Sequence, residues 1–365
     1  MKKIFKNWDR FLIVPTILLF GIGLLSIYSS SFGRGDFSNF KKQIIFGAIG
    51  IFLMLLFSFL DWRIFRDNPY FLLIVYFLLI IFLVLIFFFG PQIRGVKGWY
   101  KIGELTVHPV EFVKIVLILL LAKYFSKRHI EMYRIQHIVL SGFYVLVPAL
   151  LVFFQPDLGS VLILIAIWVG ILIASGIKLR HFFILCFCFF LILIFSWSFL
   201  LKEYQKERII AFLQPKLANP LEIGWSHRQA KIAIGSGGLL GQGLKKGSQT
   251  QLGFLPEPQT DFIFSAIAEE TGFLGITILF LLFGILIWRI FKIAFVVSSN
   301  FPRLFAVGFS VYLMSQIFVH MGTNLGILPI VGISLPLVSY GGSNLIITFL
   351  GLGILGSISK ELPPN

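Results

Sequence analysis

The chain has 365 residues, of which 58% are hydrophobic and only 13% are charged. Charged residues make up about 25% of an ordinary soluble domain, so this chain lacks the polar side chains that a water-facing surface of its size would need. The composition excludes a typical soluble protein and indicates a surface that mostly faces lipid. The net charge of +15 would suggest nucleic acid in a soluble chain. Because the basic residues are dispersed over many loops, we expect no nucleic-acid partner.

Ten apolar runs follow one another, each near the length of about 20 residues with which a helix crosses the hydrocarbon core. They are Phe11–Ser31, Phe40–Leu60, Pro69–Phe89, Pro109–Phe125, Ile138–Phe154, Leu158–Gly176, Phe182–Leu201, Phe262–Trp288, Leu304–Val319 and Gly342–Ser359. The fourth run is the weakest, because Glu111 and Lys114 interrupt it. We predict an all-α integral membrane protein with ten transmembrane helices, in which residues 1–365 form one membrane domain.

The basic residues of the loops predict the orientation. An even number of spans puts both termini on the same side, and sixteen Lys and Arg residues fall in the loops of that side. The short loops of the other side carry six. By the positive-inside rule both termini are therefore cytoplasmic. The basic segment Met1–Arg10 and the run that follows it are interpreted as a retained signal anchor.

The long segment 202–258, between the seventh and eighth spans, is predicted to lie outside the cytoplasm. Within it, Lys202–Leu213 and Trp225–Ile234 mix apolar and basic residues at helical spacing, which is typical of short helices on the membrane interface. The glycines between Gly235 and Gly247 leave two interpretations open. They form either flexible turns or a loop whose backbone N–H groups approach a phosphate.

Two segments near the C-terminus have structural interpretations. Met321–Gly341 carries no charge, but prolines interrupt it, so we expect a re-entrant or surface-hugging apolar loop. Gly351–Gly356 matches the dinucleotide-binding spacing G-x-G-x-x-G, but it lies inside the last apolar run. Small residues at such positions serve helix packing, and we expect no nucleotide there.

The chain has only 16 acidic residues, and those near the outer ends of the runs are the first candidates for chemistry. Glu111 and Lys114 stand three apart on one helix face. Glu111 suits an ordinary helix start, whereas a lysine one turn deeper would be costly beside lipid and favours a cavity or a site. Asp157 stands at an outer turn, where it either caps the next helix or belongs to the site.

Asp261 opens the eighth run after an outer loop rich in glycine and proline. In one interpretation Thr260 is the N-cap and Asp261 belongs to the first helical turn. In the other, Asp261 is a functional acid, with Glu269 two turns further along on roughly the same side. No spacing typical of a zinc site occurs. Acids, a lysine and the helix start at Gly341–Ser343 would serve glycosyl transfer from a lipid pyrophosphate, and equally an ion-coupled transporter.

Several longer motifs are similar to those of a known family. They are Ile232–Gly238, Gly247–Gln249, Phe254–Glu257, Thr260–Phe264, Leu335–Ser343 and Gln155–Ser160, together with the segment that carries Pro109, Glu111 and Lys114. In this combination the chain resembles the SEDS family from its first span to its last. The segment Gly247–Gln249 and the overall spacing resemble the elongation member more than the division member.

The resemblance implies a bacterial inner-membrane peptidoglycan glycosyltransferase that polymerises lipid II into glycan strands on the outer face, for cell elongation and rod shape. It implies a class B penicillin-binding transpeptidase and other membrane proteins of the elongation complex as partners. The family's essential acid falls on Asp261, and its intramembrane acid–lysine pair falls on Glu111 and Lys114. Further residues expected to bind substrate or support the site are Trp99, Asp157, Gln229, Lys245, Thr260, Glu269, Ser339 and Ser343.

Three positions depart from the family pattern. Gly98 precedes Trp99 where the family usually has arginine. His108 begins a segment that in the family usually reads Gln-Pro-Ser-Glu, and His320 stands in place of an asparagine. These departures leave Asp261 intact and leave the roles of the three positions open.

Our mechanistic hypothesis is that Asp261 accepts the proton of the acceptor sugar's 4-hydroxyl while this oxygen displaces polyprenyl pyrophosphate with inversion. The groups expected to stabilise the leaving group are Lys114, Lys245, Lys246, the N–H groups near Gly341–Ser343 and a divalent cation, Mg²⁺ or Mn²⁺. Two alternatives stay open at this point: a flippase or transporter of the lipid-linked precursor, and a non-catalytic scaffold for a transpeptidase.

Overall fold

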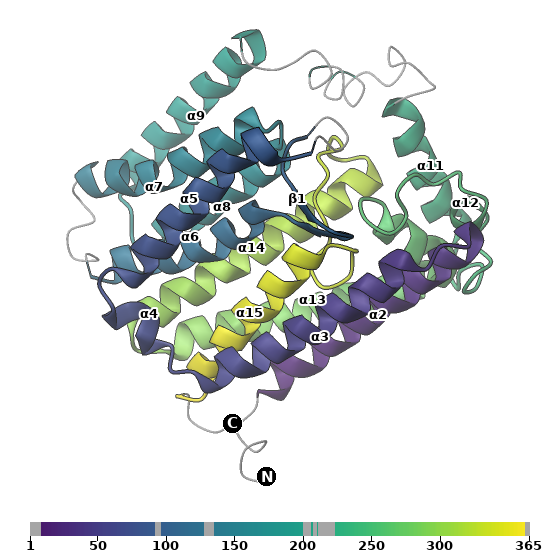
Figure 1. Cartoon of the computed structure of the whole chain (residues 1–365), viewed down its shortest axis with the longest axis horizontal. Helices are drawn as coiled ribbons and strands as arrows, with labels where there is room; N and C mark the ends of the chain where they lie inside the picture. Colours follow the sequence, from purple (N-terminus) through teal and green to yellow (C-terminus); the bar gives the residue numbers. More distant parts are fainter. Residues whose placement is uncertain are drawn as a thin grey trace.

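The protein is a bundle of long helices with a short hairpin (Figure 1). The computed structural model describes residues 9–91, 96–127, 135–199, 206, 210 and 223–361. The elements, in chain order, are α2 (Arg10–Arg34), α3 (Ser38–Phe59), α4 (Arg63–Asp67), α5 (Phe71–Phe89), β1 (Tyr100–Ile102), β2 (Leu105–Val107), α6 (Pro109–Ser126), α7 (Ile135–Phe154), α8 (Leu158–Ala174), α9 (Leu179–Phe199), α11 (Ile223–Ser236), α12 (Ser248–Gln251), α13 (Ile263–Val296), α14 (Asn300–Leu325) and α15 (Gly342–Ser359).

Helices occupy all ten ranges in which the sequence predicts spans. Eight of them, α2, α3, α5, α7, α9, α13, α14 and α15, are long and apolar enough to cross a membrane. The remaining two are α8, which is shorter at 17 residues, and α6, which carries Glu111, Lys114 and Lys123. The prediction of a multi-pass helical membrane protein is therefore confirmed, and the count of ten spans stays a prediction.

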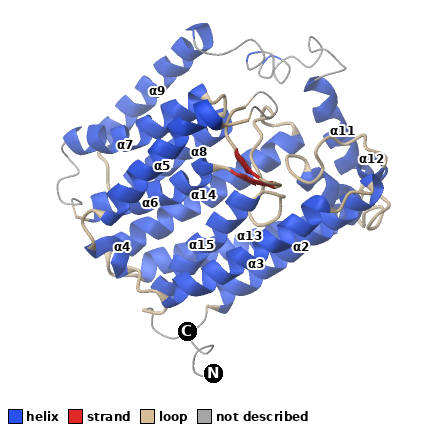
Figure 2. Ribbon diagram, in the orientation of Figure 1, coloured by secondary structure: helices blue, strands red, loops and turns tan. Residues whose placement is uncertain are grey.

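The expectation of an all-α chain is wrong in one place, where β1 and β2 form an antiparallel hairpin, drawn in red in Figure 2. Gly103 (φ 63°) supplies the left-handed conformation that the tight turn requires. The Tyr100 hydroxyl donates to the Phe82 carbonyl at 2.7 Å and so ties the hairpin to α5. Two three-residue strands are too short to produce a readable period in the sequence.

The segments around the eighth and ninth spans also differ from the predicted boundaries. Helix α13 continues to Val296, and α14 continues to Leu325, so the irregular apolar loop begins at Gly326. Gly326 (φ 70°) ends α14 in the left-handed conformation that is common just after a helix. Helix α11 confirms the helix predicted at Trp225–Ile234. The one predicted at Lys202–Leu213 lies, apart from residues 206 and 210, outside the described residues.

Small residues allow α15 to lie directly against α3. A Cβ at Gly353 would be 2.6 Å from the Met54 carbonyl oxygen, and a Cβ at Gly50 would overlap the Phe349 ring. A Cβ at Gly351 would likewise overlap the Phe309 ring of α14. The glycines of the last span therefore serve helix packing, as the sequence indicates.

Different segments of the chain lie at the two ends of the bundle. At one end lie the starts of α6 and α15, joined by a hydrogen bond from the His108 N–H to Ser343 Oγ at 2.9 Å. At the other end, Asp9 pairs with Arg289 near the end of α13, and the Trp62 indole donates to Glu361 Oε1 at 3.1 Å. The first and last described segments thus share one end, as an even number of crossings requires.

Candidate active site

Asp261 lies in the turn that leads into α13, and Thr260 does not cap this helix. The N-cap position is Phe262, whose side chain makes no capping bond among the described residues. The Thr260 hydroxyl instead donates to Glu257 Oε2 at 3.4 Å, within the preceding turn. Asp261 is half-buried and lies outside the helix. The interpretation in which Thr260 and Asp261 form an ordinary helix start is therefore wrong.

The backbone of this turn is held by two distant segments. Asn324 Nδ2 donates to the Asp261 carbonyl at 2.9 Å, while Asn324 Oδ1 accepts from the N–H and hydroxyl of Ser265. Ser339 Oγ donates to the Thr260 carbonyl at 2.9 Å. These bonds join α14, the start of α13 and the loop before α15. They fix the backbone that carries Asp261.

Gln259 anchors the same turn to the N-terminal helices. Its amide Nε2 donates to Ser31 Oγ at 3.1 Å, and its Oε1 accepts from Asn39 Nδ2 at 2.7 Å. Its carbonyl accepts from the Tyr340 N–H at 2.8 Å. Gln43 of α3 adds a further contact, donating to the Ser339 carbonyl at 3.1 Å. The turn is consequently braced by α2, α3, α14 and the loop before α15.

Glu111 and Lys114 form a buried ion pair in the first turns of α6. Lys114 Nζ lies 2.7 Å from Glu111 Oε1, and the two residues are 1% and 6% exposed. Asn344 of α15 donates to Glu111 Oε2 at 3.0 Å and also lies within hydrogen-bond distance of Tyr312 and Gln316. A buried charge is tolerated only with a partner of opposite sign and hydrogen bonds to the remaining atoms, and this pair has both.

His108 connects this pair to the hairpin and to Asp157. Its ring stacks on Trp99 with centroids 5.0 Å apart and an interplanar angle of 20°. Its Nδ1 lies 3.8 Å from Glu111 Oε1, and its Nε2 lies 3.6 Å from Asp157 Oδ2. Asp157 also caps α8 by accepting from the Ser160 N–H at 3.0 Å, so its capping role is present together with its place in the cluster.

Gly98 explains how His108 fits. A Cβ at Gly98 would lie 2.9 Å from His108 Nε2, a separation that heavy side-chain atoms do not tolerate without movement. Burial lowers the pKa of His108, and the carboxylates of Asp157 and Glu111 oppose that shift. The two departures at Gly98 and His108 are thus neighbours in space, and the smaller residue makes room for the larger ring.

The loop from Ser339 to Asn344 joins the two groups of residues. Ser339 binds the Asp261 turn, Ser343 accepts from the backbone of His108, and Asn344 binds Glu111. Of the predicted site residues, the structure therefore brings together Thr260, Asp261, Ser339 and Ser343 with Trp99, Glu111, Lys114 and Asp157.

Glu269 and Lys245 have other surroundings. Glu269 is fully buried, and its carboxylate accepts from the N–H groups of Gln249 and Thr250 at 2.7 and 3.0 Å and from the Thr250 hydroxyl at 2.6 Å. It therefore holds α12 against α13. The Lys245 ammonium lies over the rings of Tyr28 and Phe32 at 4.6 and 4.7 Å from their centroids. Both residues stabilise the 237–251 segment on α2 and α13.

The glycine-rich segment fits into a break in α13. At Gly272 (φ 66°, ψ −164°) the helix is interrupted. The carbonyls of Glu269 and Glu270 there accept from the N–H groups of Gln242 and Gly243 at 2.9 and 3.0 Å. These N–H groups are used within the protein. Of the two interpretations left open by the sequence, the geometry favours the structural one over phosphate binding.

Helix α11 packs beside the Asp261 turn. Ala230 and Ala233 share a small buried cluster with Phe262, and Gln229 is half-buried on the same helix. Lys231 reaches the end of α14, since a Cβ at Gly326 would be 2.7 Å from its Nζ. A cation beside the carboxyl end of a helix is stabilised by the helix dipole. The structure thus adds a lysine to this end of the bundle that the sequence motifs do not mark.

The structure also adds Asn324, Asn344, Gln259 and His108 to the site. An amide in the first turn of an apolar span is the one available signal, because such a group needs a partner. Asn344 gives that signal directly after Gly341–Ser343. His320, the third departure, is buried, and its Nδ1 lies 2.8 Å from the Ile333 carbonyl oxygen, so it ties α14 to the loop that follows.

A family model described as a cell cycle protein of the FtsW, RodA and SpoVE type matches residues 9–363. The chain belongs to this family. It is the SEDS family that the motifs resemble, so the predicted membership is confirmed.

Relatives and solved structures agree along the whole chain. Peptidoglycan glycosyltransferase MrdB of Escherichia coli is 36% identical over 355 residues, covering 96% of this chain and 94% of its own. A structure described as a peptidoglycan synthase complex that coordinates polymerization and crosslinking has a TM-score of 0.81 at 30% identity, covering 97% and 98% of the two chains. Rod shape determining protein RodA of Thermus thermophilus has a TM-score of 0.73 at 26% identity, covering 99% and 100%. The predicted enzyme class is the one that several curated relatives, MrdB among them, carry in their names.

Proposed function

We propose that the protein is a peptidoglycan glycosyltransferase that polymerises lipid II for cell elongation. In this proposal the chain crosses the bacterial inner membrane ten times, with α6 and α8 among the spans, both termini in the cytoplasm and the Asp261 end outside. Family membership supports the enzyme class. The observation that carries the proposal is the bracing of the Asp261 backbone by Gln259, Asn324 and Ser339, which fixes this half-buried acid at the same end as the buried Glu111–Lys114 pair.

Asp261 is proposed as the general base. The acceptor sugar's 4-oxygen forms a bond to the anomeric carbon of the donor, and the bond from this carbon to the pyrophosphate oxygen breaks. The hydroxyl proton passes to Asp261, and polyprenyl pyrophosphate leaves with the bonding electrons. Attack from the opposite face inverts an α-linked donor into a β-linked strand. A base placed within hydrogen-bond reach of the attacking hydroxyl typically contributes a factor of about 10²–10⁴ in rate.

The buried acid–lysine pair is proposed to shape this end of the bundle. Lys114 is neutralised by Glu111, so its charge is not available to a pyrophosphate unless the pair separates. Through Asn344 the pair instead fixes the start of α15, whose Gly341–Ser343 backbone is the proposed contact for the leaving group. In this proposal the pair supports the site without touching the substrate.

A divalent cation, Mg²⁺ or Mn²⁺, remains part of the proposal as a companion of the substrate. Among the residues that the structure describes, no three His, Cys, Asp or Glu side chains form a group that could hold a metal ion. The residues present therefore do not fit a metal held by the protein alone. Mg²⁺ commonly binds through substrate phosphates with one or two carboxylates, and in that form it would neutralise the leaving pyrophosphate.

The partner is proposed to be a class B penicillin-binding transpeptidase. The structural neighbour described as a synthase complex that coordinates polymerization and crosslinking supports this assignment. Other membrane proteins of an elongation complex, lipid II, the growing glycan strand and membrane lipid complete the proposed interactions.

The test is glycan polymerisation by the purified protein with its partner and labelled lipid II in liposomes. We expect Asp261→Asn to lower the rate at least about 10²-fold. Glu104→Gln is the matched control, since Glu104 is an exposed acid on the hairpin, and it should retain the rate. Undiminished polymer from Asp261→Asn would refute the base. Lipid transfer across the bilayer without any polymer would identify a flippase, and activity that depends only on the partner would identify a scaffold. EDTA, followed by Mg²⁺ or Mn²⁺, tests the cation in the same assay.

A further inference from the structure

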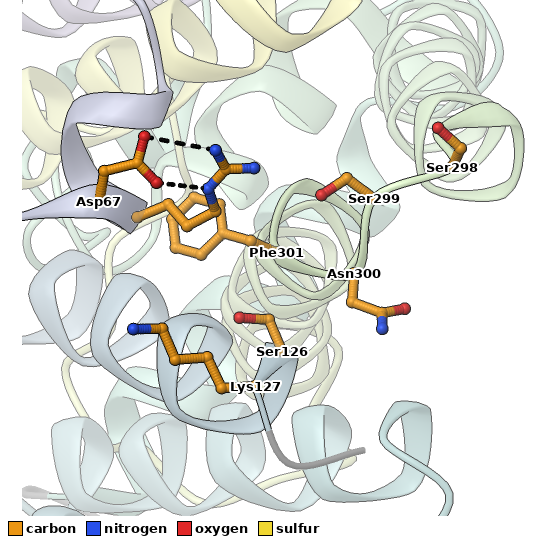
Figure 3. A pocket seen from close by; sticks show the side chains of 8 residues that line it. Asp67, Ser126, Lys127, Ser298, Ser299, Asn300 and Phe301 are labelled. Atoms are coloured by element: carbon orange, nitrogen blue, oxygen red, sulfur yellow. Dashed lines mark hydrogen bonds and ion pairs between the residues drawn. The ribbon is translucent and has the colours of Figure 1, made fainter. Parts of the chain in front are cut away.

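A polar cavity of about 460 Å³ lies at the end of the bundle opposite Asp261. Three separate segments surround it (Figure 3): α4, the end of α6, and the turn from α13 into α14. Its lining consists of Arg66, Asp67, Ser126, Lys127, Ser298, Ser299, Asn300 and Phe301. The positive-inside bias assigns this end to the cytoplasm. None of these residues takes part in the proposed polymerisation, so the cavity requires its own explanation.

The floor of the cavity is closely packed. Phe301 is 1% exposed and stacks on Trp62 with centroids 5.6 Å apart and an interplanar angle of 10°. The Arg66 guanidinium lies 5.3 Å from the centroid of the same indole. Two aromatic rings and an arginine that are fixed against one another provide a preformed wall, which reduces the ordering cost of binding.

The charged lining favours an anion. Arg66 uses Nε and Nη2 to bind the two carboxylate oxygens of Asp67 at 2.7 and 3.3 Å. A guanidinium has five N–H donors, so three remain for another acceptor. This contact with Arg66 lowers the pKa of Asp67 and keeps its carboxylate charged. Lys127 adds a second cation, which leaves the lining with one net positive charge (two cations less one carboxylate).

The polar groups suit a phosphate in particular. Ser298 and Ser299 present hydroxyls on one side of the cavity (Figure 3). Ser299 is the N-cap of α14, and its side chain makes no capping bond within the described part of the chain. Hydroxyls and the first N–H groups of this 26-residue helix add donors to those of the arginine.

We propose that this cavity binds the phosphate headgroup of an anionic phospholipid from the cytoplasmic leaflet. Its walls are the C-terminal end of α6, the start of α14 and α4, which connects α3 to α5. In the proposed ten-span topology these segments lie at a membrane surface, where lipid headgroups are found. Basic pockets between transmembrane helices on the cytoplasmic side bind such headgroups in other proteins. A phosphate diester supplies the acceptor oxygens for Arg66 and the hydroxyls, while the acyl chains stay in the bilayer beside the helices.

Native mass spectrometry of the full chain in mild detergent, titrated with phosphatidylglycerol or phosphatidylethanolamine, measures the binding directly. We expect phosphatidylglycerol to be retained over phosphatidylethanolamine. We expect Lys127→Gln to weaken this retention about fivefold, the effect of one basic residue near an anionic headgroup. Asp67→Asn should strengthen retention, because it removes the one negative charge of the lining. Lys292→Gln is the matched control, since Lys292 lies over Trp288 away from the cavity, and it should bind as the unchanged chain does.

Three outcomes would overturn the proposal. Equal retention by the unchanged chain, Lys127→Gln and Lys292→Gln would show that the lipid binds elsewhere. Weaker binding by Asp67→Asn would contradict the charge assignment. Displacement of the lipid by inorganic phosphate at low millimolar concentration would identify a site for free phosphate. Thermal unfolding of each variant checks that it is folded, and its polymerisation rate should stay unchanged because the cavity lies apart from Asp261.

Discussion

At the scale of single residues, the site depends on groups that are far apart in sequence and mutually adjusted. Asn344 is 233 positions from Glu111, and Asn324 is 63 positions from Asp261, yet each pair shares a hydrogen bond. Motifs and local spacing cannot reveal such pairs, because an amide in an apolar segment shows that it needs a partner but not which residue the partner is. Asp261 could be found because it is one of few acids near the ends of the predicted spans, whereas the amides that hold its turn could not.

Gly98 and His108 give the first prediction at this scale. We expect Gly98→Ala to destabilise the protein by about 1–3 kcal/mol, the usual cost of overpacking, because the added Cβ meets His108 Nε2. Adding His108→Gln to Gly98→Ala should recover part of the loss, since it removes the ring. Thermal unfolding in detergent measures both variants. Additive losses in the double variant would show that the two positions act independently.

His108 also makes stability depend on pH. Burial lowers its pKa below the ordinary value of about 6.5. The unfolded chain therefore takes up this proton first as the pH falls, and the stabilisation present above about pH 6.5 is lost below it. Asp157, Glu111 and Lys114 face this ring, so the comparison needs a variant that removes the imidazole alone. Between pH 7 and pH 5 we expect the melting temperature of the unchanged chain to fall further than that of His108→Gln. Parallel curves would contradict the assignment.

At the scale of elements, hydropathy predicts the long helices but does not predict the hairpin or the break inside α13. All ten predicted ranges contain a helix. A single apolar segment of about 20 residues in lipid can form all its backbone hydrogen bonds internally only as a helix. The hairpin at Tyr100–Val107 and the break at Gly272 have no such constraint. The placement of Lys245 could not be foreseen either, because it follows from bonds of its backbone N–H to Ser29 and Glu270 on two distant helices.

Gly272 allows a direct test of the break in α13. An alanine there would have a strained positive φ, and its Cβ would overlap the Gly241 backbone nitrogen. We expect Gly272→Ala to cost at least about 2 kcal/mol and to release the 237–251 segment. Gly284→Ala in the same helix is the control, because nothing lies within 4 Å of its Cβ position. Limited proteolysis should cut the segment faster in the first variant only. Equal resistance of both variants would show that the helix tolerates a side chain at the break.

At the scale of the whole molecule, the end opposite the site is fastened by a buried ion pair. Arg289 Nε lies 2.6 Å from Asp9 Oδ2, and both side chains are nearly inaccessible. Asp9 also caps α2 by accepting from the Phe11 N–H. The pair joins the start of α2 to a residue near the end of α13, so it closes the bundle between segments that are 280 positions apart.

Breaking this pair should be far more costly than replacing it. We expect Arg289→Met to destabilise the protein by about 3–5 kcal/mol, because it leaves a buried carboxylate without its partner. Asp9→Asn combined with Arg289→Met should recover most of that loss, since the amide can still cap α2. Thermal unfolding of the single and double variants measures both losses of stability. A double variant as unstable as Arg289→Met alone would show that the charges contribute little.

The bracing of the Asp261 turn has a consequence for the biosynthesis of the protein. The hydroxyl that binds the Thr260 carbonyl belongs to Ser339, 79 positions later in the chain. Asp261 is therefore synthesised well before Asn324 and Ser339, which hold its turn. The turn stays unsupported while α14 and the following loop are inserted. In the proposed mechanism a nascent chain cannot complete the Asp261 site until translation has passed Tyr340. We therefore expect activity to begin only once the membrane bundle is complete.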